Sequence, residues 1–174
     1  MGLTLAVELW ADWSSRRELQ FLWLYNVFVI VEYGLLCWYF WKISGSWLKK
    51  YILLSIPVFA AISVVVSIRL YGFNKYPGQN INIEGMLLTV ICAGVLFNLD
   101  SKVHASIIRH PDFWICCGWL IFCTGTFLSN GLLTYLMSLD HAVANRVFEM
   151  INHPLNLVLY TCLTLGFICA IPRK

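Results

Sequence analysis

The stretch LYNVFVIVEYGLLCWYF, residues 24–40, is almost entirely apolar and carries a single carboxylate, Glu32, near its middle. A bilayer-spanning α-helix needs about 20 predominantly apolar residues, which this stretch and its flanks provide. A charged side chain at the centre of such a helix costs about 2.5 kcal/mol or more on insertion scales. The stretch therefore predicts a transmembrane helix in which Glu32 has a partner, a polar surrounding or a function.

The composition places the whole chain in the membrane class. Of its 174 residues, 60% are hydrophobic and only 12% are charged, whereas soluble domains carry about 25% charged residues. The net charge of +3 is spread along the chain and does not suggest a nucleic-acid-binding surface. We therefore expect an integral membrane protein whose main partner is the lipid bilayer.

Long apolar blocks separated by short polar connections predict an all-α, antiparallel transmembrane bundle that forms a single domain over residues 1–174. The expected spans are residues 19–41, 51–71, 83–99, 113–137 and 147–171. In the segment before them, Leu5, Leu9 and Trp13 share a helical face. That spacing favours a short amphipathic helix at the membrane surface, and the alternative is part of a further span.

Lysine and arginine residues in the short loops predict the orientation, because cytoplasmic loops carry an excess of them. Five lie on the side of the N-terminus: Arg16, Arg17, Arg69, Lys75 and Arg146. Seven lie on the other side: Lys42, Lys49, Lys50, Lys102, Arg109, Arg173 and Lys174. This difference favours a multi-pass protein of the cell membrane whose C-terminus is cytoplasmic.

Polar residues of several spans fall in the same half of the membrane, which is the outer leaflet in this orientation. The candidate site residues are Tyr25, Asn26, Glu32, Arg69, Asn130, Glu149, Asn152, His153 and Asn156. Polar groups at membrane depth normally face the bundle interior and find one another. The pattern predicts an outer-leaflet polar cavity, and the alternative is a polar seam that holds helices together.

The last span carries the clearest polar stripe. Its members recur at steps of four, three and four residues and so share one helical face: Asn145, Glu149, Asn152 and Asn156. His153 lies beside this stripe, and Pro154 follows it. Proline removes the hydrogen bond to the carbonyl of Met150, so we expect a kink there that opens room for water or a ligand.

Glu32 can avoid the cost of a buried charge in three ways. It can stay protonated, pair with a cation such as Arg69 or a protonated His153, or line a wet cavity. We predict that Glu32 faces the bundle interior in a cluster with Tyr25, His153 and Asn156. A second carboxylate, Glu84, opens the expected third span, where it would favour the positive end of the helix dipole.

The residue spacings do not indicate metal or nucleophile chemistry. The cysteine and histidine positions form no zinc or iron pattern, and no nucleophile motif is present. We therefore expect no metal and no cofactor, and favour a non-enzymatic protein: a sensory, ligand-binding or accessory subunit for a membrane signalling partner. One alternative is a small membrane enzyme that acts on a lipid, with Glu32 and His153 as acid and base. A second is a transporter-like subunit that works as an oligomer.

Three strings carry a family resemblance: LWLYNVFVIVEYGLL, RHPDFWICCGWLIFCTGTFL and INHPLNLVLYTCLTLGFICAIP. With them the chain loosely resembles a group of small uncharacterised bacterial polytopic membrane proteins. Those proteins tend to share a similar L-Y-N…E-[YF] helix, a P-x-F-W opening to a later helix and a polar last helix. The resemblance implies a place, the bacterial inner membrane beside a signalling partner, and not an activity.

Overall fold

The computed structural model describes residues 22–71, 78–100, 107–137 and 141–171. Its elements are α2 (Leu22–Ile43), α3 (Ser46–Val66), the π-helical turn η1 (Ser67–Tyr71), α4 (Gly78–Asp100), the 3-10 turn η2 (Ile107–Arg109), α5 (Pro111–Met137) and α6 (His141–Ala170). No strand occurs within these ranges, which confirms the expected all-α fold. The amphipathic segment expected near Leu5 lies outside the described residues.

Five helices are long and apolar enough to cross a membrane, judged by length and composition. Their bounds extend beyond the expected apolar blocks at the N-terminal ends of four helices: slightly in α5, which begins at Pro111 rather than residue 113, and further in the other three. The helix α3 begins at Ser46 rather than residue 51, α4 at Gly78 rather than residue 83, and α6 at His141 rather than residue 147. The length of an apolar run indicates only the part of a helix that lies in the lipid. The helical backbone hydrogen bonds continue into the polar residues that flank the run.

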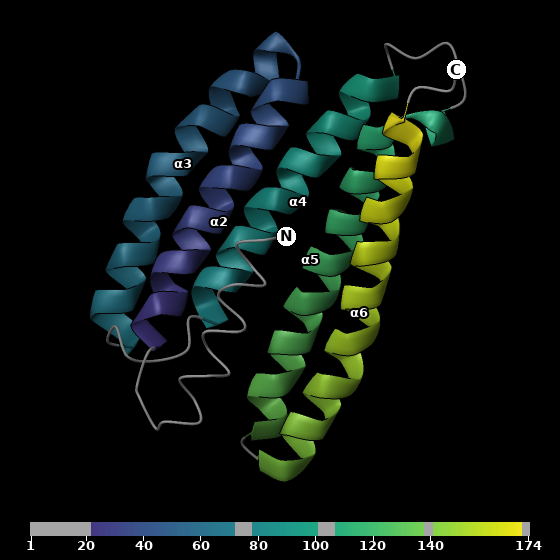
Figure 1. Cartoon of the computed structure of the whole chain (residues 1–174). Coiled ribbons are helices and arrows are strands. Elements are labelled where there is room, and N and C mark those ends of the chain that lie inside the picture. The colour runs from purple at the N-terminus through teal and green to yellow at the C-terminus, as the bar shows by residue number, and fades with distance from the viewer. Residues whose placement is uncertain (1–21, 72–77, 101–106, 138–140, 172–174) are drawn as a thin grey trace.

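The helices run antiparallel along the chain, and α4 occupies the middle of the arrangement (Figure 1). It contacts α2 and α3 on one side and α5 on the other. The last helix, α6, packs mainly on α5, and within the described part of the chain it barely touches α2. The bundle is therefore a three-helix group joined through α4 to an α5–α6 hairpin.

A core of large buried side chains holds the first group together. Tyr33 and Phe40 of α2, Phe59 of α3 and Leu88 of α4 are almost completely buried. The rings of Tyr33 and Phe59 lie 4.4 Å apart between centroids, and the Tyr33 hydroxyl donates a hydrogen bond of 2.8 Å to Ser55 Oγ. This phenol thus satisfies its polar atom while its ring fills the interior.

The α5–α6 hairpin packs through glycines, which allow two backbones to approach closely. A Cβ atom placed on Gly118 would lie 2.8 Å from Cys162 Cβ, a distance that real Cβ atoms do not tolerate. A Cβ atom on Gly125 would collide with the side chain of Leu155. The two glycines lie on the same face of α5, seven residues apart. They fix how close α6 comes to α5.

We expect Gly118→Ala to lower the free energy of unfolding by about 1–3 kcal/mol, because the new methyl group must push the α6 backbone away. Gly131→Ala in the same helix is the control, since a Cβ atom there meets nothing within 4 Å. Thermal unfolding of both variants in one detergent measures the difference. Equal melting temperatures for the two variants would show that the close approach at Gly118 does not hold the hairpin.

Candidate functional site

A cavity of about 360 Å³ lies between α2, α4, α5 and α6. This volume falls in the usual range for small-molecule sites, about 300–1,000 Å³. Its polar lining consists of Glu32, Asn82, Glu84, Thr126, Asn130, Asn152 and Asn156. These residues come from the half of the bundle that contains the N-terminal ends of α2 and α4. We call this space the polar cavity.

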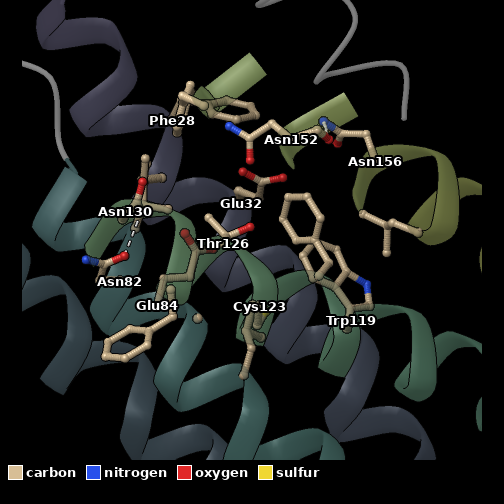
Figure 2. A pocket seen from close by; sticks show the side chains of 18 of the residues that line it. Phe28, Glu32, Asn82, Glu84, Trp119, Cys123, Thr126, Asn130, Asn152 and Asn156 are labelled. Carbon is tan, nitrogen blue, oxygen red and sulfur yellow. Dashed lines mark hydrogen bonds between the residues drawn. The ribbon is translucent and has the colours of Figure 1, made fainter. Parts of the chain in front are cut away.

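Two carboxyl groups enter the polar cavity from different helices. Glu32 of α2 is half-buried, whereas Glu84 of α4 is only 7% exposed. Figure 2 shows both side chains directed into the same space, with Thr126 between them. They are close enough for the charge of Glu32 to act on Glu84. In the described part of the chain, no hydrogen bond reaches the Glu84 carboxyl group.

Glu84 is the main site residue that the sequence analysis assigned to a different role. The expected start of its helix at residue 83 placed this carboxylate in the first turn, where it would interact with the helix dipole. Because α4 begins at Gly78, no acidic residue occupies that first turn. Glu84 instead lies more than a turn inside the helix and faces the polar cavity. The dipole interpretation is therefore wrong.

Amide side chains supply most of the remaining polar surface. Asn130 Nδ2 donates a hydrogen bond of 2.7 Å to Asn82 Oδ1, which joins α5 to α4 (Figure 2). On α6, the Asn156 amide donates to the Asn152 backbone carbonyl at 3.1 Å. The side chain of Asn152 extends toward Glu32 in Figure 2. Each amide presents both donors and acceptors, so the lining can bind groups of either kind.

The other end of the polar cavity is apolar and largely aromatic. Leu88, Trp119, Phe122, Leu159 and Tyr160 line it from the middle portions of their helices. Asn82 and Asn130, by contrast, lie close to the helix ends at the side where α2 and α4 begin. The polar lining residues thus gather toward one end of the cavity, where Phe28, Ile81 and Phe148 also line it, and the deeper wall is apolar. Polar groups at one end and an apolar wall beyond them match a molecule with a polar head and an apolar chain.

The structure brings together four of the predicted site residues, and these line the polar cavity: Glu32, Asn130, Asn152 and Asn156. Three others do not line it. Arg69 lies exposed on η1, and Glu149 and His153 lie on an exposed face of α6. His153 Nδ1 donates a 2.7 Å hydrogen bond to the Glu149 carbonyl of its own helix.

The predicted pairing of Glu32 with His153 is therefore wrong. Of the described side chains of the predicted stripe on α6, Asn152 and Asn156 line the polar cavity, whereas Glu149 is exposed. Successive side chains of an α-helix point about 100° apart around its axis. His153 therefore lies on a different face of α6 from Asn152. The side chains of Tyr25 and Asn145, which belonged to the same predictions, lie outside the described residues. The helix α6 runs without interruption through Pro154.

Asn26 belongs to a separate polar cluster. The Ser67 hydroxyl donates to Asn26 Oδ1 at 3.1 Å, and Asn80 Nδ2 donates to Ser67 Oγ at 3.1 Å. All three side chains are at least 95% buried, so water has little access to these hydrogen bonds. The cluster links α2, η1 and α4 close to the end of the bundle from which α2 starts. It is polar glue of the kind that joins helices in membranes.

Comparisons with protein families, characterised proteins and solved structures found no match. The resemblance to small bacterial membrane proteins therefore stays a prediction. Among the described residues, no group of three or more His, Cys, Asp or Glu side chains is arranged to hold a metal ion.

We expect Ser67→Ala to lower the free energy of unfolding by about 1–3 kcal/mol, because it removes a donor to Asn26 and an acceptor from Asn80 in a buried place. Ser63→Ala, one turn earlier in α3, is the matched control. Its hydroxyl is also buried but has no hydrogen-bond partner, so its loss should cost little. Thermal unfolding in detergent compares the two. A Ser63 variant as unstable as the Ser67 variant would contradict the cluster's role.

Proposed function

We propose that this protein is a non-enzymatic, multi-pass membrane protein that binds a small amphiphilic or lipidic ligand in the polar cavity. In this proposal the protein passes the occupied state to a signalling partner in the membrane. The observation that supports it is the combination of buried carboxyl and amide groups with an aromatic wall around about 360 Å³. A largely apolar pocket with a few convergent polar groups is the usual form of a small-molecule site.

Binding explains the polar cavity better than helix association does. A polar seam that only holds helices together pairs its groups with one another, as Ser67 does with Asn26 and Asn80, although the side-chain carbonyl oxygen of Asn80 itself finds no partner among the described residues. The Glu84 carboxyl group receives no hydrogen bond from the described residues, even though the side chain is buried and only 7% exposed. Burying a polar group without a partner costs free energy. A ligand that bonds to Glu84 would offset this cost in the bound state.

The enzymatic alternative has less support. It required Glu32 and His153 to act together on a lipid, and the two side chains occupy different surroundings. A general acid and a general base must both come within hydrogen-bond reach of the reacting group. For the transporter-like alternative, the described helices supply no specific observation.

We further propose that the protein resides in a bacterial inner membrane with its C-terminus in the cytoplasm. The lysine and arginine counts of the loops support this orientation. The N-terminal ends of α2 and α4 then lie toward the outside, and the polar cavity opens in the outer leaflet. A ligand would reach it from the outer leaflet or the periplasm.

A pair of C-terminal fusions in a bacterial host tests the orientation. We expect a fluorescent protein that folds only in the cytoplasm to be bright at the C-terminus, and alkaline phosphatase at the same position to be inactive. An active phosphatase with a dark fluorescent fusion would reverse the orientation and move the polar cavity to the inner leaflet. An immunoblot for equal membrane levels of both fusions is the control.

Blocking the polar cavity tests whether it binds a ligand at all. We expect dodecanol, a neutral amphiphile, to raise the melting temperature of the protein in lipid nanodiscs, because a ligand at 100 times its Kd stabilises the folded state by about 2.7 kcal/mol. Asn152→Phe places a ring in the polar cavity and should abolish this increase. Met150→Phe changes a residue of the same helix that is 69% exposed, and it should preserve the increase in melting temperature. An equal increase in both variants would place the alcohol elsewhere and contradict the proposed site.

A further inference from the structure

We infer that the polar cavity selects amphiphiles whose headgroup is an ammonium cation without a phosphate, such as long-chain amines. This inference rests on the proposed ligand-binding function and adds the chemical class of the ligand. It is carried by the position of Glu84 in the polar cavity and by the charges of the residues around it.

Glu84 is more than nine-tenths buried, and its side chain extends into the polar cavity (Figure 2). In the described part of the chain, no donor bonds to its carboxyl group. A carboxylate has two oxygens that can accept about four hydrogen bonds, and it is costly to bury without them. An ammonium group supplies N–H donors and the opposite charge at once. Charge-assisted hydrogen bonds of this kind are about twice as strong as neutral ones.

The surroundings of Glu84 favour a cation rather than an anion. Glu32 adds a second acidic group close enough to act on Glu84, and none of the described residues that line the polar cavity is Lys, Arg or His. A phosphate or carboxylate headgroup would therefore meet like charge with no basic side chain among the described lining residues to balance it. Because like charges repel strongly where water is excluded, anionic heads are disfavoured.

The rest of the lining suits the chain and the outer part of such a molecule. Trp119 and Tyr160 form part of the aromatic wall, and aromatic faces attract cations as well as alkyl chains. The amides of Asn130 and Asn152 supply further acceptor oxygens beside the carboxyl groups. A head bound at Glu84 would leave the chain to extend along Leu88 and the aromatic residues toward the middle of the membrane. The apolar deeper wall thus favours this direction of binding.

A neutral headgroup is the competing solution, and it makes a different prediction. If both acidic side chains were protonated, their hydroxyl groups would donate hydrogen bonds, and an alcohol would satisfy them as well as an amine. The head charge of the ligand would then have little effect on affinity. Probes that share one chain and differ only in head charge separate the two solutions.

The experiment measures the binding of dodecylamine, dodecanol and dodecanoate to the full chain in nanodiscs of zwitterionic lipid, from melting temperatures at increasing probe content. We expect the amine to bind at least tenfold more tightly than the alcohol, and the carboxylate to bind least. Glu84→Gln keeps the size of the side chain and removes its charge. It should weaken amine binding by about tenfold, the effect of losing one charge-assisted bond, and leave alcohol binding unchanged.

Two further variants complete the design. Glu32→Gln should also weaken amine binding, and it remains informative if Glu84→Gln fails to fold. Glu149→Gln removes an exposed carboxylate of α6 that does not line the polar cavity, so it should leave amine binding unchanged. Equal affinities for amine and alcohol, or an equal effect of all three variants, would overturn the preference for a cation while the binding function remained. No binding of any probe would overturn both proposals.

Discussion

The interior of a bilayer offers no hydrogen bonds, so every polar side chain at membrane depth must be satisfied by the protein or by something the protein encloses. Many polar side chains of the described helices meet this constraint in one of two ways. Some polar groups pair across helices, as Asn26 does with Ser67. Others open into the polar cavity, as Glu84 does. The difference between these two arrangements separates structural residues from candidate ligand-binding residues.

The paired groups occupy both ends of the bundle and join its helices. At the end opposite to the polar cavity, the Tyr39 hydroxyl donates a 3.0 Å hydrogen bond to Asp112 and so connects the end of α2 to the start of α5. His110 Nδ1 lies 3.5 Å from the other oxygen of the same carboxylate. Toward the other end, the Asn26 cluster connects α2 to η1 and α4. The polar cavity is thus enclosed by helices that are held together independently of it.

The sequence predicted the helices well because a membrane span has a strong one-dimensional signal: about 20 apolar residues between polar flanks. It also placed Glu32, Asn130 and Asn152 in the same half of the membrane, since depth follows from the position along a span. Which face a residue occupies is harder to predict. His153 and Asn152 are neighbours in the chain, yet only Asn152 lines the polar cavity. No pattern in a single helix shows which neighbouring helix it will meet.

Glu84 illustrates a second limit of the sequence. Its role depended on where α4 begins, and the polar residues Asn80 and Asn82 hid the true start at Gly78. The length of an apolar run could not show that these asparagines belong to the helix. Their polar side chains are accommodated there because they form hydrogen bonds with partners on other elements, Ser67 and Asn130. Both partners come from distant parts of the chain. Contacts of this kind become visible only once the helices are placed together.

The polar cavity exists because α6 is held away from α2, and the close packing of α6 on α5 accounts for this. Gly125 packs on Leu155, and the next residue of each helix, Thr126 and Asn156, lines the polar cavity. A step of one residue turns the side chain by about 100°, so the face that joins the hairpin and the face that lines the cavity are adjacent on both helices. A larger residue at position 125 would push α6 outward and change the cavity wall. The same glycine contact that stabilises the hairpin therefore also sets the width of the candidate site.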